Sequence, residues 1–530
     1  MITAVFIICA LFTIANLLLE LKRDLMMLQQ NSYRHERYLG WLRQSGDTTS
    51  TTRLIGMAVF LVSLVTWAST DWAMAMMVMY CGANAWMLFR KKYKKPLVWT
   101  KRAKRIYGVD ILLSIAIMAA GIVFFGLSSF DQAVFTVALC ALLAYCGSHI
   151  VTLASLAILA PYEKKVNRKF YDDAERILRS RPDLTIIGIT GSYGKTSTKH
   201  YLHRILSEQF DTLMTPGSYN TTMGVIRTVR EMLKPYNEVF IVEMGAKNIG
   251  DIKEICDLVR PQMGIITAVG EQHLESFKTI ENVQRTKFEL VDSLPATGLA
   301  VVNNDFPFAA NRNVGNVECI HYAVRSKDGA NYVAKEIDYT PQGTTFVMSG
   351  PDCELELRTR LVGECNISNL MAAVIIARRL GVPDEKIRYA VEQIEQVEHR
   401  LNMKVTPAGI TIIDDAFNSN PTGSAMALDV LSHMTSGKRI IVTPGMIELG
   451  DRQEELNHEF GRKIASCADI AIIVGEYNRE AIVSGIKEGG MDSSKIHEAE
   501  TFKAAQAILA GIMTPGDTVL YENDLPDTFK

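Results

Sequence analysis

The chain has 530 residues, a formal net charge of −2 and a hydrophobic content of 48%. This length exceeds that of one ordinary domain and suggests about three. The near-neutral charge does not favour a nucleic-acid-binding protein, and nine scattered cysteines without a CxxC pair favour neither a zinc site nor a disulfide framework.

The first third of the chain is strongly apolar. It begins with an apolar run of the length that a helix needs to cross a bilayer, and four more runs follow. The runs lie near residues 2–20, 53–69, 72–89, 109–128 and 132–160. We therefore predict a helical transmembrane domain of about five spans over residues 1–162. The alternative is that these runs are buried helices of a large soluble domain.

Basic residues predict the orientation of these spans. They are concentrated in segments 21–53 and 90–105, whereas the short connections near 70–71 and 129–131 contain no Lys or Arg. Because basic loops remain in the cytoplasm, the N-terminus is expected outside and everything after about residue 162 inside. The sequence thus predicts a multi-pass protein of a bacterial-type inner or plasma membrane, with its catalytic domains in the cytoplasm and the lipid bilayer as a partner.

After Pro161 the pattern changes to short apolar runs that alternate with helical patterns or loops. This alternation is typical of an α/β fold with a mostly parallel sheet covered on both faces. A break near residues 398–400 divides the region into two α/β domains, 163–398 and 399–530. Within the first domain, the pattern of residues 317–362 predicts alternating strands with turns, which form either an antiparallel edge of the sheet or a subdomain.

A glycine-rich turn follows the apolar run 185–189 and precedes a helical pattern over 195–207. A strand, a glycine turn and a helix in this order form a phosphate loop. Its N–H groups hold phosphate oxygens, a lysine neutralises their charge and the next hydroxyl ligates Mg²⁺. Ile189 stands where a strict Walker A motif has glycine, which favours a variant loop. The predicted nucleotide-binding residues are Thr190, Gly191, Ser192, Tyr193, Gly194, Lys195, Thr196 and Ser197.

Eight further motifs follow the phosphate loop in order. They are TPGSYNTTMGV (215–225), IVEMGAKNIGDI (241–252), HLESF (273–277), TKFE (286–289), GECNISNLMAA (363–373), HRL (399–401), DDAFNSNP (414–421) and GMIELGDR (445–452). Together with the phosphate loop, this series resembles the Mur ligase family over roughly residues 180–530. Within that family it is most similar to the branch that adds D-alanyl-D-alanine.

The resemblance implies a P-loop ATP-binding central domain and a Rossmann-like C-terminal domain. It also implies an ATP-dependent acid–amino-acid ligase of peptidoglycan precursor synthesis. In this chemistry ATP phosphorylates a substrate carboxylate to an acyl phosphate, and an amine then displaces phosphate. Cations are expected to dominate the site because it must hold two anions against each other.

The resemblance also implies two Mg²⁺ ions. Thr196 and Glu243 would hold the first, while His273 and Lys287 would serve the second. Lys287 matches a carbamylated lysine, and a carbamate can help to hold a metal as an ammonium cannot. Taken alone, Glu243 could be a helix-cap partner, His273 a hydrogen-bonded loop histidine and Lys287 a surface lysine.

Other implied site residues lie further along the chain. Asn366 and Asn369 match asparagines beside the adenine, although two asparagines at a helix start could also be caps. Arg400 is expected to meet phosphate and Asp415 the ribose. The implied catalytic residues are Lys195, Lys287, His273 and Arg400. The loop asparagines expected to contact substrate are Asn220, Asn418 and Asn420.

The chain departs from the family pattern near the expected amine and acceptor sites. These departures are Thr221, Ala268, Cys365, His399 and Gly445. The largest departure is upstream, where apolar helices replace the family's UDP-binding domain. We therefore hypothesise an acceptor that lies in the membrane, such as a lipid-linked cell-wall precursor, with an amino acid or a dipeptide as the amine.

Two other interpretations are open from the sequence. A polymer-forming ligase such as poly-γ-glutamate synthase also resembles Mur ligases and is membrane-associated, but its phosphate loop usually reads GTRGK. The other is a non-catalytic ATP-binding membrane scaffold. The joint presence of the implied ATP and metal residues argues against lost chemistry.

Overall fold

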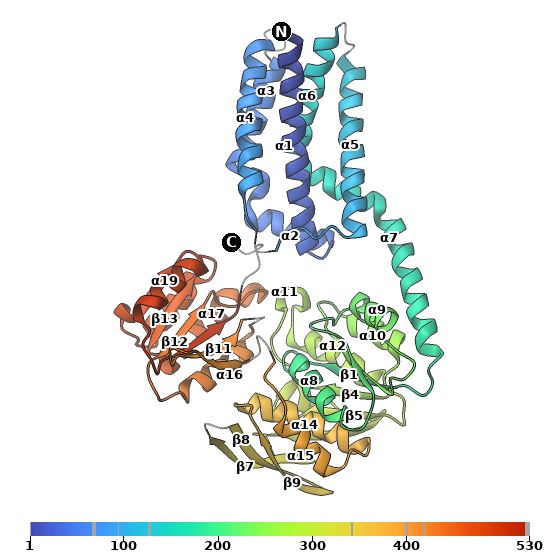
Figure 1. The fold of residues 1–530 in the computed structure, drawn as a ribbon, viewed down its shortest axis with the longest axis vertical. Helices are drawn as coiled ribbons and strands as arrows, with labels where there is room; N and C mark the ends of the chain where they lie inside the picture. Colours follow the sequence, from blue (N-terminus) through green and yellow to red (C-terminus); the bar gives the residue numbers. More distant parts are fainter. Residues whose placement is uncertain are drawn as a thin grey trace. The chain divides into compact units, whose positions relative to one another are not determined.

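The computed structural model describes residues 2–65, 70–93, 95–125, 129–340, 343–397, 401–416 and 419–524. The described chain divides into two compact units that meet in the sequence at Asn167 and Arg168. The first unit is helical and the second is α/β (Figure 1).

Most helices of the helical unit, coloured blue to cyan in Figure 1, are long and apolar; α2 is short and polar, and α7 continues into the second unit. α1 packs against α4 and α6, and α5 packs against α6. The helices are α1 (Ile2–Gln30), α2 (His35–Ser45), α3 (Thr51–Val65), α4 (Thr70–Arg90), α5 (Lys101–Phe125), α6 (Phe130–Cys146) and α7 (Ser148–Arg179). A short 3-10 turn, η1 (Asp47–Thr49), connects α2 to α3.

The predicted spans are only partly matched. Among the described helices, α1, α4 and α5 are each long and apolar enough to cross a membrane. The apolar run predicted as a span near 132–160 forms α6 and α7, which together are long and apolar enough to cross a membrane but are bent by 79° at the break between them. Gly147 is the C-cap of α6, and glycine is a weak helix former that favours such a break. The last part of the predicted span 53–69 lies outside the described residues.

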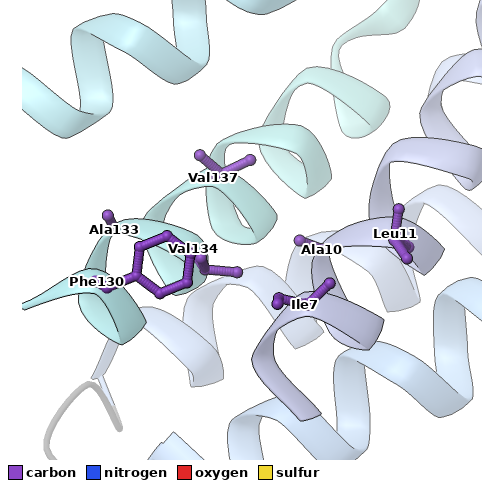
Figure 2. A pocket seen from close by; sticks show the side chains of 7 residues that line it. All are labelled: Ile7, Ala10, Leu11, Phe130, Ala133, Val134 and Val137. Atoms are coloured by element: carbon purple, nitrogen blue, oxygen red, sulfur yellow. The ribbon is translucent and has the colours of Figure 1, made fainter. Parts of the chain in front are cut away.

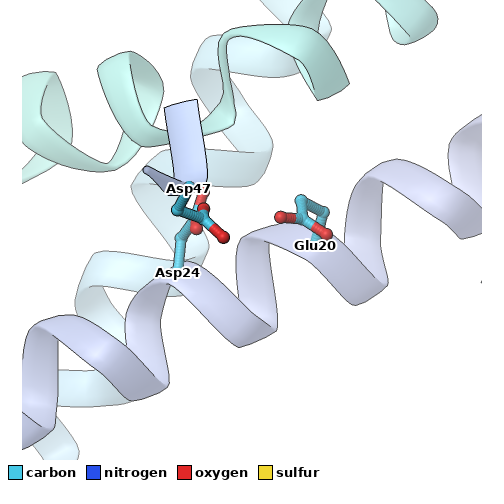
Figure 3. A group of neighbouring side chains, drawn as sticks. All are labelled: Glu20, Asp24 and Asp47. Carbon is cyan, nitrogen blue, oxygen red and sulfur yellow. The ribbon is translucent and has the colours of Figure 1, made fainter. Parts of the chain in front are cut away.

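Charged side chains are buried inside the helical unit. Glu20, Asp24 and Asp47 lie close together (Figure 3) and are 2%, 0% and 7% exposed. The guanidinium of Arg53 donates to Glu20 at 2.8 Å and lies 3.3 Å from both Asp24 and Asp47. Arg23 also donates to Glu20 and Asp47. Two cations of the chain thus offset most of the charge of these three carboxylates, so the group does not depend on a metal ion to be held together.

The exterior of the helical unit is apolar. Val65, Phe89, Val123 and Phe124 are each 81–84% exposed. An apolar hollow of about 350 Å³ lies between α1 and α6 (Figure 2), and its lining contains no polar side chain. The lining residues are Ile7, Ala10, Leu11, Phe130, Ala133, Val134 and Val137. An exposed apolar surface of this extent indicates apolar surroundings or a partner.

The described strands of the first sheet follow the order β2-β3-β1-β4-β5-β6-β7-β8-β9. Neighbours from β2 to β7 are parallel, and β8 is antiparallel to β7 and β9. The predicted antiparallel edge is therefore confirmed for β7–β9, whereas β6 continues the parallel part. The bounds are β1 (Thr185–Thr190), β2 (Thr212–Met214), β3 (Val239–Glu243), β4 (Met263–Ile266), β5 (Leu299–Asn303), β6 (Glu318–Ala323), β7 (Tyr332–Thr340), β8 (Gly343–Gly350) and β9 (Cys353–Thr359).

Apolar side chains alternate between the faces of this sheet, as the period of a strand requires. Phe240 and Val242 belong to one core, whereas Ile187 and Ile241 belong to another. Both faces are thus buried, in agreement with the predicted parallel sheet. The helices of this part are α8 (Lys195–Leu206), α9 (Thr222–Glu231), α10 (Asp251–Val259), α11 (Leu274–Phe277), α12 (Ile280–Asp292), α13 (Pro307–Ala310), α14 (Glu364–Arg379) and α15 (Asp384–Glu392).

In the described residues after 400, a second sheet has the order β10-β11-β15-β12-β13-β14. Only β10 and β11 pair antiparallel; the other described neighbours are parallel. The last strand lies between β11 and β12. The elements are β10 (Asn402–Val405), β11 (Thr411–Asp415), α16 (Pro421–Ser432), β12 (Arg439–Thr443), η2 (Gly450–Arg452), α17 (Gln453–Cys467), β13 (Ile470–Val474), α18 (Arg479–Glu488), η3 (Ser493–Lys495), β14 (Ile496–Ala499), α19 (Phe502–Ile512) and β15 (Thr518–Glu522).

Candidate active site

The phosphate loop connects β1 to α8, as predicted. β1 lies among the parallel strands, so the loop is at their carboxyl ends, where open α/β sheets bind ligands. Gly191 and Gly194 have φ angles of 154° and 80°. A Cβ would lie 2.0 Å from Thr267 Oγ1 at Gly191 and 2.5 Å from Asn369 Oδ1 at Gly194. Both positions therefore require glycine.

Two hydroxyl groups shape the loop. Thr190 Oγ1 donates to Met244 O at 2.8 Å, and Ser192 Oγ donates to Gly270 O at 2.9 Å. The backbone N–H of Ser192 donates to Ala268 O at 2.9 Å. Thr190 and Ser192, both predicted to bind nucleotide, thus anchor the loop to the ends of β3 and β4.

The cation of the loop lies directly over its backbone. Lys195 Nζ donates to the carbonyl oxygens of Gly191 and Ser192, at 2.7 and 3.3 Å. Tyr193 packs edge-on against Phe306, with ring centroids 5.1 Å apart. The ammonium group of Lys195 is therefore at the glycine turn, as phosphate binding requires.

Glu243 ends β3 and is 1% exposed. Its Oε2 accepts from Lys199 Nζ at 2.9 Å, and its Oε1 accepts from Asn220 Nδ2 at 3.1 Å. Burial alone would raise the pKa of Glu243, but Lys199 and Lys195 hold it below the ordinary value. The carboxylate is therefore ionised and held in place beside the phosphate loop.

Lys199 was not among the residues predicted from the sequence. It lies one helical turn after Lys195 on α8, is fully buried, and also donates to Gly217 O. It thereby connects the phosphate-loop helix, Glu243 and the segment that contains Asn220. A fully buried lysine requires such partners, but a lysine in an amphipathic helix pattern gives no sign of this role.

Lys287 lies on α12, is 1% exposed and is not a surface lysine. Burial lowers its pKa well below the ordinary value, and the charge of Lys195 lowers it further. Lys287 in turn lowers the pKa of His273. Lys195 thus lies within electrostatic range of Glu243 and Lys287, and Lys287 lies within electrostatic range of His273.

His273 precedes α11 and contacts a residue of the second sheet domain. Its Nδ1 is hydrogen-bonded to Glu448 Oε2, and Glu448 Oε1 accepts from Lys247 Nζ at 2.9 Å. Burial lowers the pKa of His273, although Glu448 opposes this effect. Burial would raise the pKa of Glu448, but His273 and Lys247 hold it well below its usual range.

The two predicted adenine-side asparagines lie on α14 and are each 7% exposed. Asn369 Oδ1 accepts from Thr198 at 3.0 Å, next to the phosphate loop. Asn366 accepts from Tyr201 at 2.7 Å and donates to Val362 O at 2.8 Å. Neither side chain is the N-cap of α14, because that position is Gly363.

The remaining predicted residues belong to the second sheet domain. Asp415 ends β11, and its Oδ1 accepts from Leu401 N at 3.2 Å. The Asn420 side chain caps α16 by accepting from Gly423 N at 3.0 Å, which is a structural role. Arg400 and Asn418 lie outside the described residues.

The donor atoms at the phosphate loop suit a nucleotide-bound Mg²⁺, which prefers oxygen ligands. Thr196 supplies a hydroxyl at the start of α8, and Glu243 supplies a buried carboxylate beside the same helix. Ser197, the last residue of the motif, is 7% exposed. A glycine turn, a lysine, a hydroxyl and an acidic strand end define a P-loop nucleotide-dependent enzyme.

Comparison with known proteins places this enzyme more narrowly. Residues 189–377 match the Mur ligase middle domain, and residues 399–521 match the Mur ligase, glutamate ligase domain. A UDP-N-acetylmuramoyl-tripeptide–D-alanyl-D-alanine ligase of Mycobacterium tuberculosis is 30% identical over 365 residues, which are 64% of this chain and 70% of that protein. The chain belongs to the Mur ligase family, whose members are ATP-dependent ligases that use Mg²⁺.

Other relatives agree. The ligase with the same name from Haemophilus influenzae is 28% identical over 59% of this chain and 68% of its own length. MurF from Acinetobacter baumannii has a TM-score of 0.61 and 28% identity, covering 67% of this chain and 76% of its own. MurF from Thermotoga maritima in complex with ADP has a TM-score of 0.60 and 25% identity, covering 67% and 80%. Neither family model extends into residues 1–188.

Proposed function

We propose that the protein is a membrane-anchored ligase that joins a cell-wall peptide carboxylate to a D-alanyl-D-alanine-type amine. The observation that carries this proposal is the geometry of the phosphate loop, where Lys195 lies over the glycine turn and Lys199 holds the buried carboxylate of Glu243 beside the same helix. The substrates follow from the names of the relatives, which are D-alanyl-D-alanine ligases of UDP-N-acetylmuramoyl-tripeptide.

In the proposed reaction, a carboxylate oxygen of the acceptor attacks the γ phosphorus of ATP and ADP leaves. Lys195 offsets the charge of the β and γ phosphates during this transfer. The amine nitrogen then attacks the acyl carbon, phosphate leaves with the electrons of the broken C–O bond, and the amine loses a proton. Mg²⁺ held by Thr196 and Glu243 supplies further positive charge when bound.

Lys287 is proposed to act as its carbamate. Burial lowers the pKa of Lys287 well below its ordinary value, which favours the neutral amine, and the neutral amine is the form that adds CO₂. The resulting anion would be compensated by Lys195 and would serve the second metal with His273. Removal of CO₂ and bicarbonate should then reduce activity reversibly, and a ¹³C-labelled bicarbonate signal should disappear in Lys287→Gln.

The other site residues are proposed in the roles that the family resemblance implies. Asn366 and Asn369 lie on the adenine side, Asp415 binds the ribose and Arg400 the phosphate. Asn220, which is bonded to Glu243, supports the first metal ligand as well as the substrate loop. Asn418 and Asn420 are proposed to contact substrate.

The first 162 residues are proposed as a transmembrane domain, followed by an ATP-binding domain to residue 398 and a ligase domain to residue 530. The support comes from the spanning length of α1, α4 and α5 and from the apolar exterior of the unit. This region occupies the place of a UDP-binding domain, so we propose that the acceptor is presented at the cytoplasmic face of the membrane, as a lipid-linked precursor.

The test is phosphate release by the full-length protein in proteoliposomes with ATP and Mg²⁺. Candidate acceptors are soluble UDP-muramoyl-tripeptide and its lipid-linked form, each with D-alanyl-D-alanine or single amino acids. We expect release only with a matched pair, and its loss in Lys195→Ala. Full activity of detergent-free soluble fragments on the UDP-linked acceptor would show that the helices only anchor the enzyme. Unchanged cellular function of Lys195→Ala would instead favour the scaffold interpretation.

A further inference from the structure

Glu448 lies in the loop that follows β12 in the second sheet domain. Side-chain amides are hydrogen-bonded to the backbone of this loop. Asn457 Oδ1 accepts from Met446 N at 2.9 Å, and Asn478 Nδ2 donates to Met446 O at 2.9 Å. Asn523 Nδ2 donates to Gly445 O at 2.6 Å. These amides are at most 7% exposed, so the loop presents Glu448 in a fixed position.

Glu448 uses both carboxylate oxygens on the ATP-binding domain. One oxygen is bonded to His273 Nδ1 and the other to Lys247 Nζ. His273 follows β4 and Lys247 follows β3, the two strands that flank β1. A single carboxylate thus joins the loops on either side of the phosphate loop.

The backbone at this contact is strained on both sides. Glu448 has a φ of 62° and His273 a φ of 53°, which non-glycine residues seldom adopt. Such conformations persist where the surroundings enforce them, often at functional sites. Here the two strained residues are hydrogen-bonded to each other, and each domain supplies one of them.

We infer that Glu448 is a positioning residue that completes the His273 metal site when the C-terminal domain is docked. Metal-binding histidines usually donate their second ring N–H to a carboxylate, which fixes the tautomer and the ring orientation. With Nδ1 committed to Glu448, Nε2 is the nitrogen left for a metal. Because the carboxylate comes from the other domain, the site is complete only while the domains are in contact.

This inference rests on the proposed function, in which His273 serves a metal. The test therefore measures metal binding directly, as electron paramagnetic resonance titration of Mn²⁺ into the full-length, detergent-solubilised protein with ADP. We expect Glu448→Gln to weaken Mn²⁺ binding by about 10-fold or more, the usual effect of losing such a partner. Glu448→Asp, which keeps the charge, should retain more of the affinity. Glu448 is 26% exposed, so these variants are expected to fold.

Two control variants separate the explanations. Arg452→Gln removes another ion pair between the domains, Arg452–Glu271, but leaves Glu448 and His273 intact, and should keep Mn²⁺ binding within about twofold. His273→Asn should weaken Mn²⁺ binding as Glu448→Gln does.

If His273→Asn weakens binding and Glu448→Gln does not, the inference is wrong and the proposed function stands. If Arg452→Gln has an equal effect to Glu448→Gln, domain docking alone explains the result and the positioning role is overturned. If His273→Asn has no effect, the proposed metal role of His273 fails first.

Discussion

The two units of this protein distribute polarity in opposite ways. In the helical unit, Asp24 and Arg53 are 0% and 3% exposed while Val123 and Phe124 are 82% and 84% exposed. In the α/β unit, Ile241 and Leu370 are fully buried, and ion pairs such as Lys253–Asp257 lie on the surface. The second distribution suits water. The first suits apolar surroundings, in which charges must be paired inside.

Both units nevertheless bury a cation against carboxylates. Arg53 is surrounded by Glu20, Asp24 and Asp47 in the helical unit, and Lys199 is bonded to Glu243 in the α/β unit. The difference lies in what each group does. The first group connects helices, whereas the second holds a proposed metal ligand beside the phosphate loop.

The largest effect is expected from Arg53→Met. This change leaves three buried carboxylates with less compensating charge and should lower the free energy of unfolding by about 3–5 kcal/mol. Thermal and denaturant unfolding of the detergent-solubilised protein would measure it. Arg43→Met, at an exposed position of α2, is the control and should stay within about 0.5 kcal/mol. Equal stability of the two variants would contradict the buried network.

Lys199→Met is the corresponding change in the α/β unit. We expect the free energy of unfolding to fall by about 3 kcal/mol, the lower end of the range for breaking a buried ion pair. The loss should not be larger, because Asn220 still donates to Glu243. Unlike Arg53→Met, it should also weaken Mg²⁺ activation of phosphate release. The control is Lys253→Met, whose lysine forms a surface pair and is 58% exposed. A stable Lys199→Met variant with normal Mg²⁺ activation would show that the Lys199–Glu243 pair does not hold a metal ligand in place.

The opposite exteriors are tested by placing arginine at equally exposed apolar sites. Leu112 on α5 is 64% exposed and Tyr236 in the α/β unit is 65% exposed. Leu112→Arg should disfavour membrane insertion by about 2.5–3.5 kcal/mol, measured as the fraction that resists alkaline extraction. Tyr236→Arg should change stability by at most about 0.5 kcal/mol. Normal insertion of Leu112→Arg would show that this face does not meet lipid.

The smallest effect concerns the contact between the two α/β domains. His273 and Lys247 hold the pKa of Glu448 well below its usual range. The ionised carboxylate therefore contributes to the free energy of unfolding above pH 4.5, the ordinary pKa of Glu. This contribution is lost as the pH falls through the lowered pKa. The difference in unfolding free energy between wild type and Glu448→Gln should be about 1 kcal/mol at pH 7 and should shrink on acidification. If the difference in unfolding free energy grew on acidification, the pKa of Glu448 would be raised in the folded protein and not lowered.

Local patterns in the sequence were sufficient for several features. The phosphate loop, its helix from Lys195 and the alternation of strands and helices were predicted because each depends on neighbouring residues. The bend at Gly147 was missed because an apolar run is equally compatible with one helix or two. Lys199 and Glu448 were missed as partners because they meet Glu243 and His273 across 44 and 175 residues.

By itself, the sequence determined the family, the α/β class and the composition of the phosphate loop, because these follow from ordered motifs and from short-range periodicity. Only the tertiary structure decided which cations neutralise which carboxylates. Burial makes an unpaired charge costly, and the partner that satisfies it can come from any part of the chain that the fold brings near. Arg53 with its three carboxylates, and Glu448 with His273, are such pairings.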